Sequence, residues 1–307
     1  MFDFDVVIIG GGPAGLTAGL YLSRANRRTI LLEKEIFGGY VKNVGWVENY
    51  PGFADGISGP QLASEMVTQG SKYGLQFKQA EVTEIELFSS SRWVQCADGN
   101  GYTTSVVIIA GGSRPKKLGV PGEEMLQGKG VFHCALCDGG QFVNRVVAVC
   151  GGGDSGVTEA LYLTKLVSKI ILIEAESKLT ATSILQNRAL DNPKIEIHCG
   201  MKVEAIVGND RVKAIEFTET RNGQRGTLMV DGVLVHIGLD PNTNYLQGIV
   251  PLDSQGQIIV NNQMETKIPY IFAAGDIRSG SPRQISTAVG DGAIAGVSAQ
   301  KLLQELL

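Results

Sequence analysis

The sequence predicts an α/β protein made of two domains with the same three-layer architecture, the second inserted into the first. Two observations carry this prediction. Glycine-rich segments at 10–15 and 151–156 each follow an apolar strand pattern, and each opens a helix that leads to a strand ending in an acidic residue. The two segments begin 141 residues apart, which indicates two copies of one unit. We expect the first domain to comprise residues 1–114 and 244–307, and the second residues 115–243.

Composition places the chain among globular proteins and excludes several classes. Of 307 residues, 43% are hydrophobic and 19% are charged, and the net charge is −4. Basic residues occur in runs no longer than a pair, so nucleic acid is not expected as a partner. Apolar runs fall short of the ~18 residues that span a bilayer. A strand pattern from Val6 leaves no room for a signal peptide, and five cysteines do not form a disulfide scaffold, so we expect a cytoplasmic protein.

The first glycine-rich segment has the organisation of a dinucleotide-binding, Rossmann-like unit. A strand at 5–9 precedes it, a helix follows from 14 to about 25, and a strand at 29–32 ends in Glu33, which lies 23 positions after Gly10. Glycines permit the tight turn and let backbone N–H groups and the helix N-terminus meet a pyrophosphate. Glu33 is placed to accept hydrogen bonds from a ribose.

The rest of the first domain alternates loops, strands and helices. Residues 35–60 are rich in Gly and Pro and are expected to form a binding loop or to be disordered, and an amphipathic helix is expected to follow at 60–74. Strands are predicted at 76–88, 92–97 and 102–109.

The second segment repeats the pattern. A helix is expected from 154 to about 166, and a strand at 169–173 ends in Glu174, again 23 positions after the first glycine, Gly151. Further strands are predicted at 195–199, 203–208, 211–219 and 227–235. The chain is expected to cross back to the first domain at 236–243 and to end in a helix from Ile285 to Leu306.

A Cys-x-x-Cys pair, Cys134 and Cys137, lies fourteen residues ahead of the second glycine segment. Thiols at this spacing can close a small disulfide ring and exchange two electrons. Asp138 is the one ionisable side chain within the motif that could act as acid or base for the departing thiolate. A zinc site is disfavoured because a second pair of ligands is missing, so no metal is expected.

The remaining thiols and imidazoles carry weaker predictions. Cys96, Cys150 and Cys199 lie in strand patterns and are interpreted as buried structural cysteines. His133 could approach the dithiol, but a solvated loop histidine is the favoured interpretation. His198 and His236 carry no prediction.

Taken together, these segments closely resemble the low-molecular-weight thioredoxin reductases, in the pyridine nucleotide–disulfide oxidoreductase group. The resemblance covers essentially the whole chain and rests on Gly10–Gly15, Val47–Gly52, Cys134–Gly139, Gly151–Ser155, Gly238–Thr243, Ala274–Asp276 and Arg283-Gln284. It implies a homodimer, an FAD held by the first and last segments, and a second nucleotide domain that carries the dithiol.

The resemblance also implies roles for individual residues. FAD contacts are expected from Gly10, Gly12, Pro13, Ala14, Gly15, Glu33, Gly39, Tyr40, Asn49, Gly111, Gly275, Asp276, Arg283 and Gln284. The second nucleotide is expected at Gly151, Gly153, Asp154, Ser155, Gly156 and Glu174. Cys137 would face the flavin, and Cys134 would attack the disulfide of thioredoxin or a thioredoxin-like protein.

Two departures from the family pattern concern the electron donor and the flavin loop. The family carries a basic His-Arg-Arg motif for the ribose 2′-phosphate of NADPH, whereas this chain has Glu174-Ala175-Glu176. Two carboxylates repel a phosphate, so NADPH is disfavoured, and NADH or another dinucleotide, a second FAD included, is expected. Gly156 replaces the family's usual Ala. Tyr40 replaces a common Gln, and it could equally stack on a ring system or pack within its loop.

The leading hypothesis is therefore an FAD-dependent disulfide oxidoreductase that passes two electrons to Cys134/Cys137 and on to thioredoxin. One alternative is a ferredoxin-, NADH- or second-flavin-linked enzyme with a different disulfide acceptor. Another is a redox-sensing nucleotide-binding protein without catalytic turnover.

Overall fold

A computed structural model describes residues 2–305, so the predicted helix end at Leu306 lies outside the described residues. The chain divides into two compact units, and unit 1 is built from both ends of the chain. Unit 1 comprises the residues up to Lys42, Trp46–Arg114 and the residues from Asp240 on; unit 2 comprises Asn43–Gly45 and Pro115–Leu239. Residues 240–243 were predicted to belong to the second domain, but they belong to unit 1. The backbone N–H of Asn242, for example, donates to Gly112 O of unit 1 at 3.1 Å.

Unit 1 contains a seven-stranded mixed sheet in the order β3-β2-β1-β6-β5-β4, with β17 beside β6. Its strands are β1 (Phe4–Ile9), β2 (Thr29–Glu33), β3 (Gln76–Gln79), β4 (Val82–Leu87), β5 (Arg92–Cys96), β6 (Gly101–Ile109) and β17 (Ile271–Ala273). β1, β2, β3, β6 and β17 pair in parallel, while β4 and β5 join them antiparallel. The single strand predicted at 76–88 is wrong, because β3 and β4 lie at opposite edges of the sheet.

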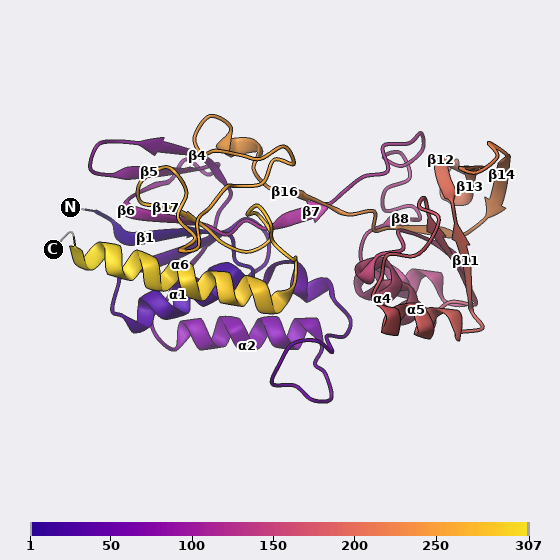
Figure 1. The fold of residues 1–307 in the computed structure, drawn as a ribbon, viewed down its shortest axis with the longest axis horizontal. Coiled ribbons are helices and arrows are strands. Elements are labelled where there is room, and N and C mark those ends of the chain that lie inside the picture. Colours follow the sequence, from indigo (N-terminus) through magenta and orange to yellow (C-terminus); the bar gives the residue numbers. More distant parts are fainter. Residues whose placement is uncertain (1, 306–307) are drawn as a thin grey trace. The chain divides into compact units, whose positions relative to one another are not determined.

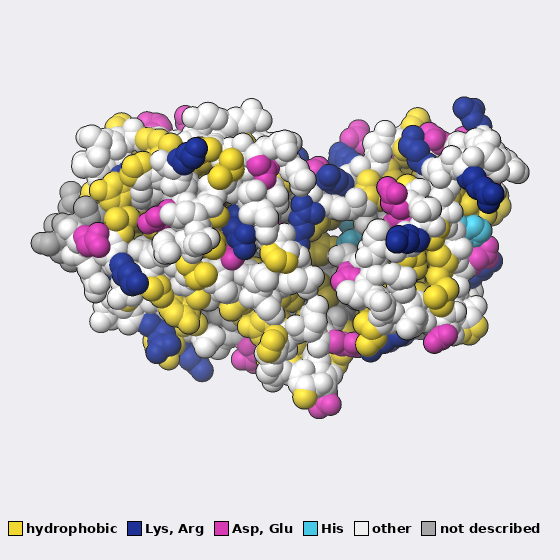
Figure 2. All heavy atoms as spheres, in the orientation of Figure 1, with side chains coloured by type: hydrophobic (Ala, Val, Ile, Leu, Met, Phe, Trp, Pro, Cys, Tyr) yellow, Lys and Arg dark blue, Asp and Glu magenta, His cyan; other side chains and the backbone are white. Residues whose placement is uncertain are grey.

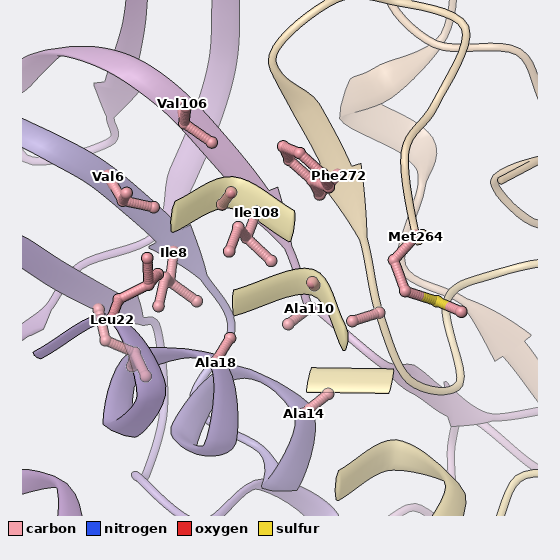
Figure 3. Packing of buried hydrophobic residues seen from close by; sticks show 14 of the residues in the cluster. Val6, Ile8, Ala14, Ala18, Leu22, Val106, Ile108, Ala110, Met264 and Phe272 are labelled. Carbon is pink, nitrogen blue, oxygen red and sulfur yellow. The ribbon is translucent and has the colours of Figure 1, made fainter. Parts of the chain in front are cut away.

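Three helices lie along one side of this sheet: α1 (Pro13–Arg24), α2 (Gly59–Ser71) and α6 (Ile285–Glu305) (Figure 1). Strand β1 is buried on both faces, as its apolar run predicts. Val6 and Ile8 pack on the helix side with Leu22 (Figure 3). Val7 and Ile9 pack on the opposite side, against residues of β4, β5 and the segment from 246 to 258. The unit is therefore three-layered, with a β-hairpin and loops as the third layer.

Unit 2 repeats the plan with a five-stranded parallel sheet in the order β11-β10-β9-β15-β8. These strands are β8 (Val131–Phe132), β9 (Val146–Cys150), β10 (Lys169–Glu174), β11 (Ile195–Cys199) and β15 (Gly232–Val235). The helices α3 (Ala135–Asp138), α4 (Asp154–Leu163) and α5 (Ser183–Leu190) share a core with one face. The antiparallel sheet β12 (Met201–Gly208), β13 (Val212–Glu219) and β14 (Arg225–Met229) shares a core with the other face.

Several predicted elements in this unit need correction. Helix α4 ends at Leu163 rather than near 166. The strand predicted at 227–235 is two strands, β14 and β15, which belong to different sheets. Helices α3 and α5 were not predicted, since both are short and their apolar positions show little periodicity.

The connecting segments β7 (Ser113–Pro115) and β16 (Leu239–Pro241) pair as a two-stranded sheet. The short 3₁₀ turns η1 (Gly39–Asn43), η2 (Gly139–Phe142) and η3 (Asn244–Leu246) complete the described elements. Within residues 2–305 no helix combines the length and apolarity required to cross a membrane. On the face in Figure 2, basic side chains are scattered among acidic ones and form no single patch.

Candidate active site and nucleotide-binding loops

The first glycine loop leaves the N-terminus of α1 open to a ligand. Gly12 is the N-cap residue, no side chain caps the helix, and its first turn contains no acidic residue. A Cβ atom added at Gly12 would have no neighbour within 4 Å. Uncapped N–H groups together with the helix dipole favour a phosphate at this position.

The carboxylate of Glu33, at the end of β2, is anchored to this loop. Its Oε2 accepts from the backbone N–H of Gly11 at 2.7 Å, and its Oε1 accepts from the N–H of Glu35 at 2.9 Å. A half-buried carboxylate is thereby held beside the glycine loop, where the sequence predicted a ribose ligand.

Other predicted glycines of unit 1 meet at the same edge of the sheet. Loops after β1, β6 and β17 lie at the carboxyl ends of adjacent parallel strands, where open α/β sheets bind ligands. A Cβ atom on Gly10 would lie 2.7 Å from Gly111 Cα, and one on Gly275 would lie 2.9 Å from Ala14 Cβ. A Cβ atom on Gly39 would lie 2.8 Å from Gly12 Cα. Only glycine permits these approaches.

Four of the polar residues predicted for the cofactor lie in two pairs, Asn49 with Gln284 and Asp276 with Arg283. Asn49 donates from Nδ2 to Gln284 Oε1 at 3.1 Å, although the two residues lie far apart in the sequence. Burial raises the pKa of Asp276, and the nearby Arg283 guanidinium opposes that rise. Tyr40 lies half-buried in η1.

Sequence reasoning missed a buried ion pair beneath this loop. Arg278 donates from Nε and Nη2 to the two carboxylate oxygens of Asp291, at 2.7 and 2.9 Å. The same carboxylate accepts the backbone N–H of Gly275 at 3.1 Å. Asp291 is an acidic residue on the buried face of α6, between the buried residues Ala288 and Ala295, and that pattern could have identified it.

The second glycine loop reproduces the first in detail. Glu174, at the end of β10, accepts the N–H of Gly152 at 2.7 Å and the N–H of Glu176 at 3.0 Å. Gly153 is the N-cap of α4 and has no side-chain cap. Cβ atoms on Gly15 and on Gly156 would each lie 2.0 Å from the carbonyl oxygen of the first glycine of their own loop, so both helices approach their loops equally closely.

One feature distinguishes the second loop. Asp154 occupies the first turn of α4, and its Oδ1 accepts the backbone N–H of Thr182 at 2.6 Å. Ser155 is exposed beside it. The second loop therefore places a carboxylate where the first has Pro13, which makes it less favourable for phosphate.

Cys134 and Cys137 form a disulfide with a Cα–Cα distance of 5.4 Å. The bond spans the start of α3: Cys134 is the N-cap, and its Sγ accepts the backbone N–H of Cys137 at 3.0 Å. Cys134 is buried, with 8% of its surface exposed, whereas Cys137 is exposed. Asp138 ends α3 and accepts from Gln141 Nε2 at 3.4 Å. The roles predicted for the two sulfurs and for Asp138 stay predictions.

Glu159, on the inner face of α4, also belongs to this site and was not predicted. Its Oε2 accepts the backbone N–H of Ala135, the residue after Cys134, at 2.6 Å. Burial raises the pKa of Glu159 to about 7, and the Ala135 N–H opposes the rise. In the sequence it stands three residues after Gly156 and four before Leu163, so helical spacing already places it on the buried face.

Comparison with known proteins identifies the family. The family model described as pyridine nucleotide-disulphide oxidoreductase matches residues 4–292. The chain belongs to this family. Thioredoxin reductases from Listeria innocua and Bacillus subtilis are 41% and 42% identical to it over 304 residues, covering 99% of this chain and 95% and 96% of theirs. The crystal structure of thioredoxin reductase from Lactococcus lactis matches with a TM-score of 0.96 at 38% identity, covering 99% of this chain and 100% of that one.

These relatives confirm the predicted fold class and the predicted function, an oxidoreductase of the thioredoxin reductase type with Cys134–Cys137 as its disulfide. Membership of the pyridine nucleotide-disulphide oxidoreductases implies FAD and a pyridine nucleotide. Unit 1 fits FAD: its uncapped helix N-terminus, the open space at Gly12 and the anchored Glu33 carboxylate match a pyrophosphate and a ribose.

Two predictions are corrected, the burial of Cys199 and the solvation of His133. Cys96 and Cys150 are buried free thiols, as expected, but Cys199 is exposed because it ends β11, the edge strand of the sheet. His133 lies in the loop between β8 and α3, as expected, but it is half-buried rather than solvated, with Nδ1 3.2 Å from Val235 O. His236, for which nothing was predicted, is buried, and its Nε2 lies 3.1 Å from His133 O. Within the described residues, no cluster of three metal-ligating side chains occurs.

Proposed function

We propose that this oxidoreductase takes two electrons from NADH, by way of FAD in unit 1, and delivers them through Cys134–Cys137 to the disulfide of thioredoxin or a thioredoxin-like protein. The observation that carries the proposal is the disulfide at the start of α3, in the unit that also bears a second dinucleotide loop. The names of the relatives support thioredoxin as the acceptor. FAD, when bound, supplies a carrier between a two-electron donor and a disulfide.

The chain's own groups account for the disulfide chemistry. Reduction breaks the Cys134–Cys137 bond, places two electrons on the sulfurs and requires up to two protons. Asp138, adjacent to Cys137, is the proposed acid that protonates the thiolate of Cys137, while Cys134 keeps its thiolate. Cys134 then attacks the partner's disulfide through its thiolate, and Cys137 resolves the mixed disulfide. This restores the ring and releases the partner as a dithiol.

The preference for NADH rests on the charges at the end of β10. Glu174 is held beside Gly152 with both of its oxygens accepting backbone N–H groups. Glu176 is exposed two residues further on. A free ribose 2′-OH can donate to such a carboxylate, whereas a 2′-phosphate would meet repulsion without an Arg partner.

The close correspondence between the two loops also supports a second FAD as the alternative ligand of unit 2. In each loop the Oε2 atom of the acid accepts the backbone N–H of the second glycine at 2.7 Å. The acid at Asp154 weakens the site for the diphosphate of either ligand and so does not choose between them. A ferredoxin donor, a redox-sensing role without turnover, a homodimer and a cytoplasmic location stay predictions.

The test is anaerobic titration of the purified flavoprotein with NADH and, separately, NADPH, while the flavin absorbance band is followed. Rapid bleaching by NADH and slow bleaching by NADPH is expected. Faster bleaching by NADPH would overturn the donor assignment. Bleaching by neither nucleotide would favour ferredoxin or a second flavin as the donor. Extraction of two FAD per chain would favour the second flavin.

The acceptor is tested with the Cys137→Ser variant. This variant should keep flavin bleaching by NADH but lose reduction of thioredoxin. Cys199→Ser, which replaces an exposed free thiol in the same unit, should keep both activities. Thioredoxin reduction by the Cys137→Ser variant would contradict the proposed route.

A further inference from the structure

Glu159 is a carboxylic acid buried next to the dithiol. Only 6% of its surface is exposed, and its surroundings on α4 are the apolar Val157, Ala160 and Leu163. Its Oε2 accepts the N–H of Ala135 at 2.6 Å. That N–H belongs to the peptide bond that follows Cys134, so the carboxyl group is bonded to the backbone of the residue whose thiol reacts.

No cation neutralises this group among the residues that the structure describes. The salt bridges of residues 2–305 do not include Glu159. The elements packed against α4 carry these ionisable side chains: Cys134, Cys137 and Asp138 at α3, Arg188 on α5, Cys150 on β9, and Lys169 and Glu174 on β10. In the disulfide form, burial and the Ala135 N–H set the pKa of Glu159, at about 7.

We propose that Glu159 is a positioning residue for Cys134 and also the group that takes up a proton when the disulfide is reduced. Reduction breaks the S–S bond and places two electrons on the sulfurs, so a thiolate at Cys134 brings a second negative charge next to the buried carboxyl group. Two like charges in one low-dielectric site raise each other's proton affinity. Near neutral pH the two groups then share one proton: where Glu159 holds it, Cys134 is the thiolate nucleophile.

The inference requires the redox role of Cys134–Cys137 but not the donor or the acceptor proposed above. A dithiol such as dithiothreitol can therefore supply the two electrons in a test, and neither nucleotide nor thioredoxin is needed. Failure of the donor assignment and failure of this inference are thereby separate results.

The experiment measures alkylation of Cys134 by iodoacetamide in the full-length Cys137→Ser protein, between about pH 5 and about pH 9, a range that spans the ordinary carboxyl and thiol pKa values. Mass spectrometry of the Cys134 peptide gives the rate. With Glu159 present, the rate should rise in two steps, because the carboxyl group and the thiol titrate as a coupled pair.

In the Glu159→Gln variant we expect a single step at lower pH and alkylation several-fold faster near neutral pH. Gln keeps an acceptor oxygen for the Ala135 N–H, so a purely structural role predicts an unchanged profile. The matched control is Glu123→Gln: Glu123 is also buried in unit 2, with 2% of its surface exposed, and accepts the N–H groups of Leu118 and Gly119. This control should keep the two-step profile.

A second measurement uses the intact dithiol. The midpoint potential of Cys134–Cys137 against dithiothreitol should change less steeply with pH in the Glu159→Gln variant near neutral pH, because one proton fewer is coupled to reduction. Identical slopes and identical alkylation profiles in the variant and the wild type would overturn the proposal.

Discussion

Glu174 accepts a hydrogen bond from the backbone N–H of Gly152 at 2.7 Å, and Glu33 makes the equivalent bond to Gly11 in the other unit at the same length. In each unit the second carboxylate oxygen accepts the N–H of the residue two positions beyond the acid. The two units thus share the anchoring of the acid as well as its spacing. The position of a carboxylate locked in this way is set before any nucleotide arrives, which suits the ribose contact proposed for it.

Replacing this acid tests the donor preference. We expect Glu174→Ala to raise KM for NADH by about 10- to 150-fold, since a lost charge-assisted hydrogen bond is worth about 1.5–3 kcal/mol. KM for NADPH should fall, because a repulsive charge is removed. Steady-state kinetics with both nucleotides provide the measurement, and Glu216→Ala, an exposed acid on β13, is the control. A parallel rise of both KM values would mean that the variant only loosens the glycine loop.

Removing one partner of the buried Arg278–Asp291 pair should cost more stability than removing one partner of an exposed ion pair. Both side chains are largely buried, with 17% and 6% exposed. Asp291→Asn leaves a buried guanidinium without its partner, so the free energy of unfolding should fall by about 3–5 kcal/mol. Urea denaturation measures the loss. Glu124→Gln, which breaks an exposed pair with Lys117, should cost less than about 1 kcal/mol, and equal losses in the two variants would refute this ranking.

Two glycines of α6 should respond to Ala in opposite directions. A Cβ atom on Gly292 would lie 2.2 Å from Ala14 O of α1, while one on Gly290 would meet nothing within 4 Å. Gly292→Ala should therefore destabilise the protein by about 1–3 kcal/mol. Gly290→Ala should stabilise it by about 0.5–1 kcal/mol through helix propensity. Thermal unfolding of both variants distinguishes them, and a shift of Tm in the same direction would contradict the packing.

His236 should make the protein sensitive to acid. Burial lowers its pKa to about 4, below the ordinary value of 6.5. Between these values the unfolded chain binds a proton that the folded chain does not, so stability is lost as the pH falls through this window, by up to about 3 kcal/mol. Glu159 acts oppositely, because its raised pKa makes the folded chain bind the extra proton between about 4.5 and about 7.

In His236→Gln the destabilising effect of His236 on acidification is removed, while the stabilising effect of Glu159 remains. The free energy of unfolding of this variant should therefore rise as the pH falls. Urea denaturation at several pH values provides the measurement. A His236→Gln profile that matches the wild type would show that His236 does not titrate in this window.

Much of the architecture could be predicted because it depends on local pattern. Strands β1 and β9 are apolar runs followed by glycine loops, and strands β2 and β10 are apolar runs that end in an acid. The tight turn from β1 or β9 into the next helix requires those glycines. Predictions failed where pairing between distant segments decides the structure. The run at 76–88 reads as one strand, yet its two halves lie at opposite edges of the sheet. Cys199 resembles a buried strand residue, and only its place on an edge strand exposes it.

The sequence by itself determined the α/β class, the two glycine loops, their acids and the redox pair, because each of these is encoded within a few tens of contiguous residues. Only the tertiary structure decided which charges are buried and what they contact. Glu159 reaches Ala135 across 24 residues, and Asp291 binds Arg278 from another element. Such contacts depend on how helices pack against loops, and packing brings together residues that no sequence spacing relates.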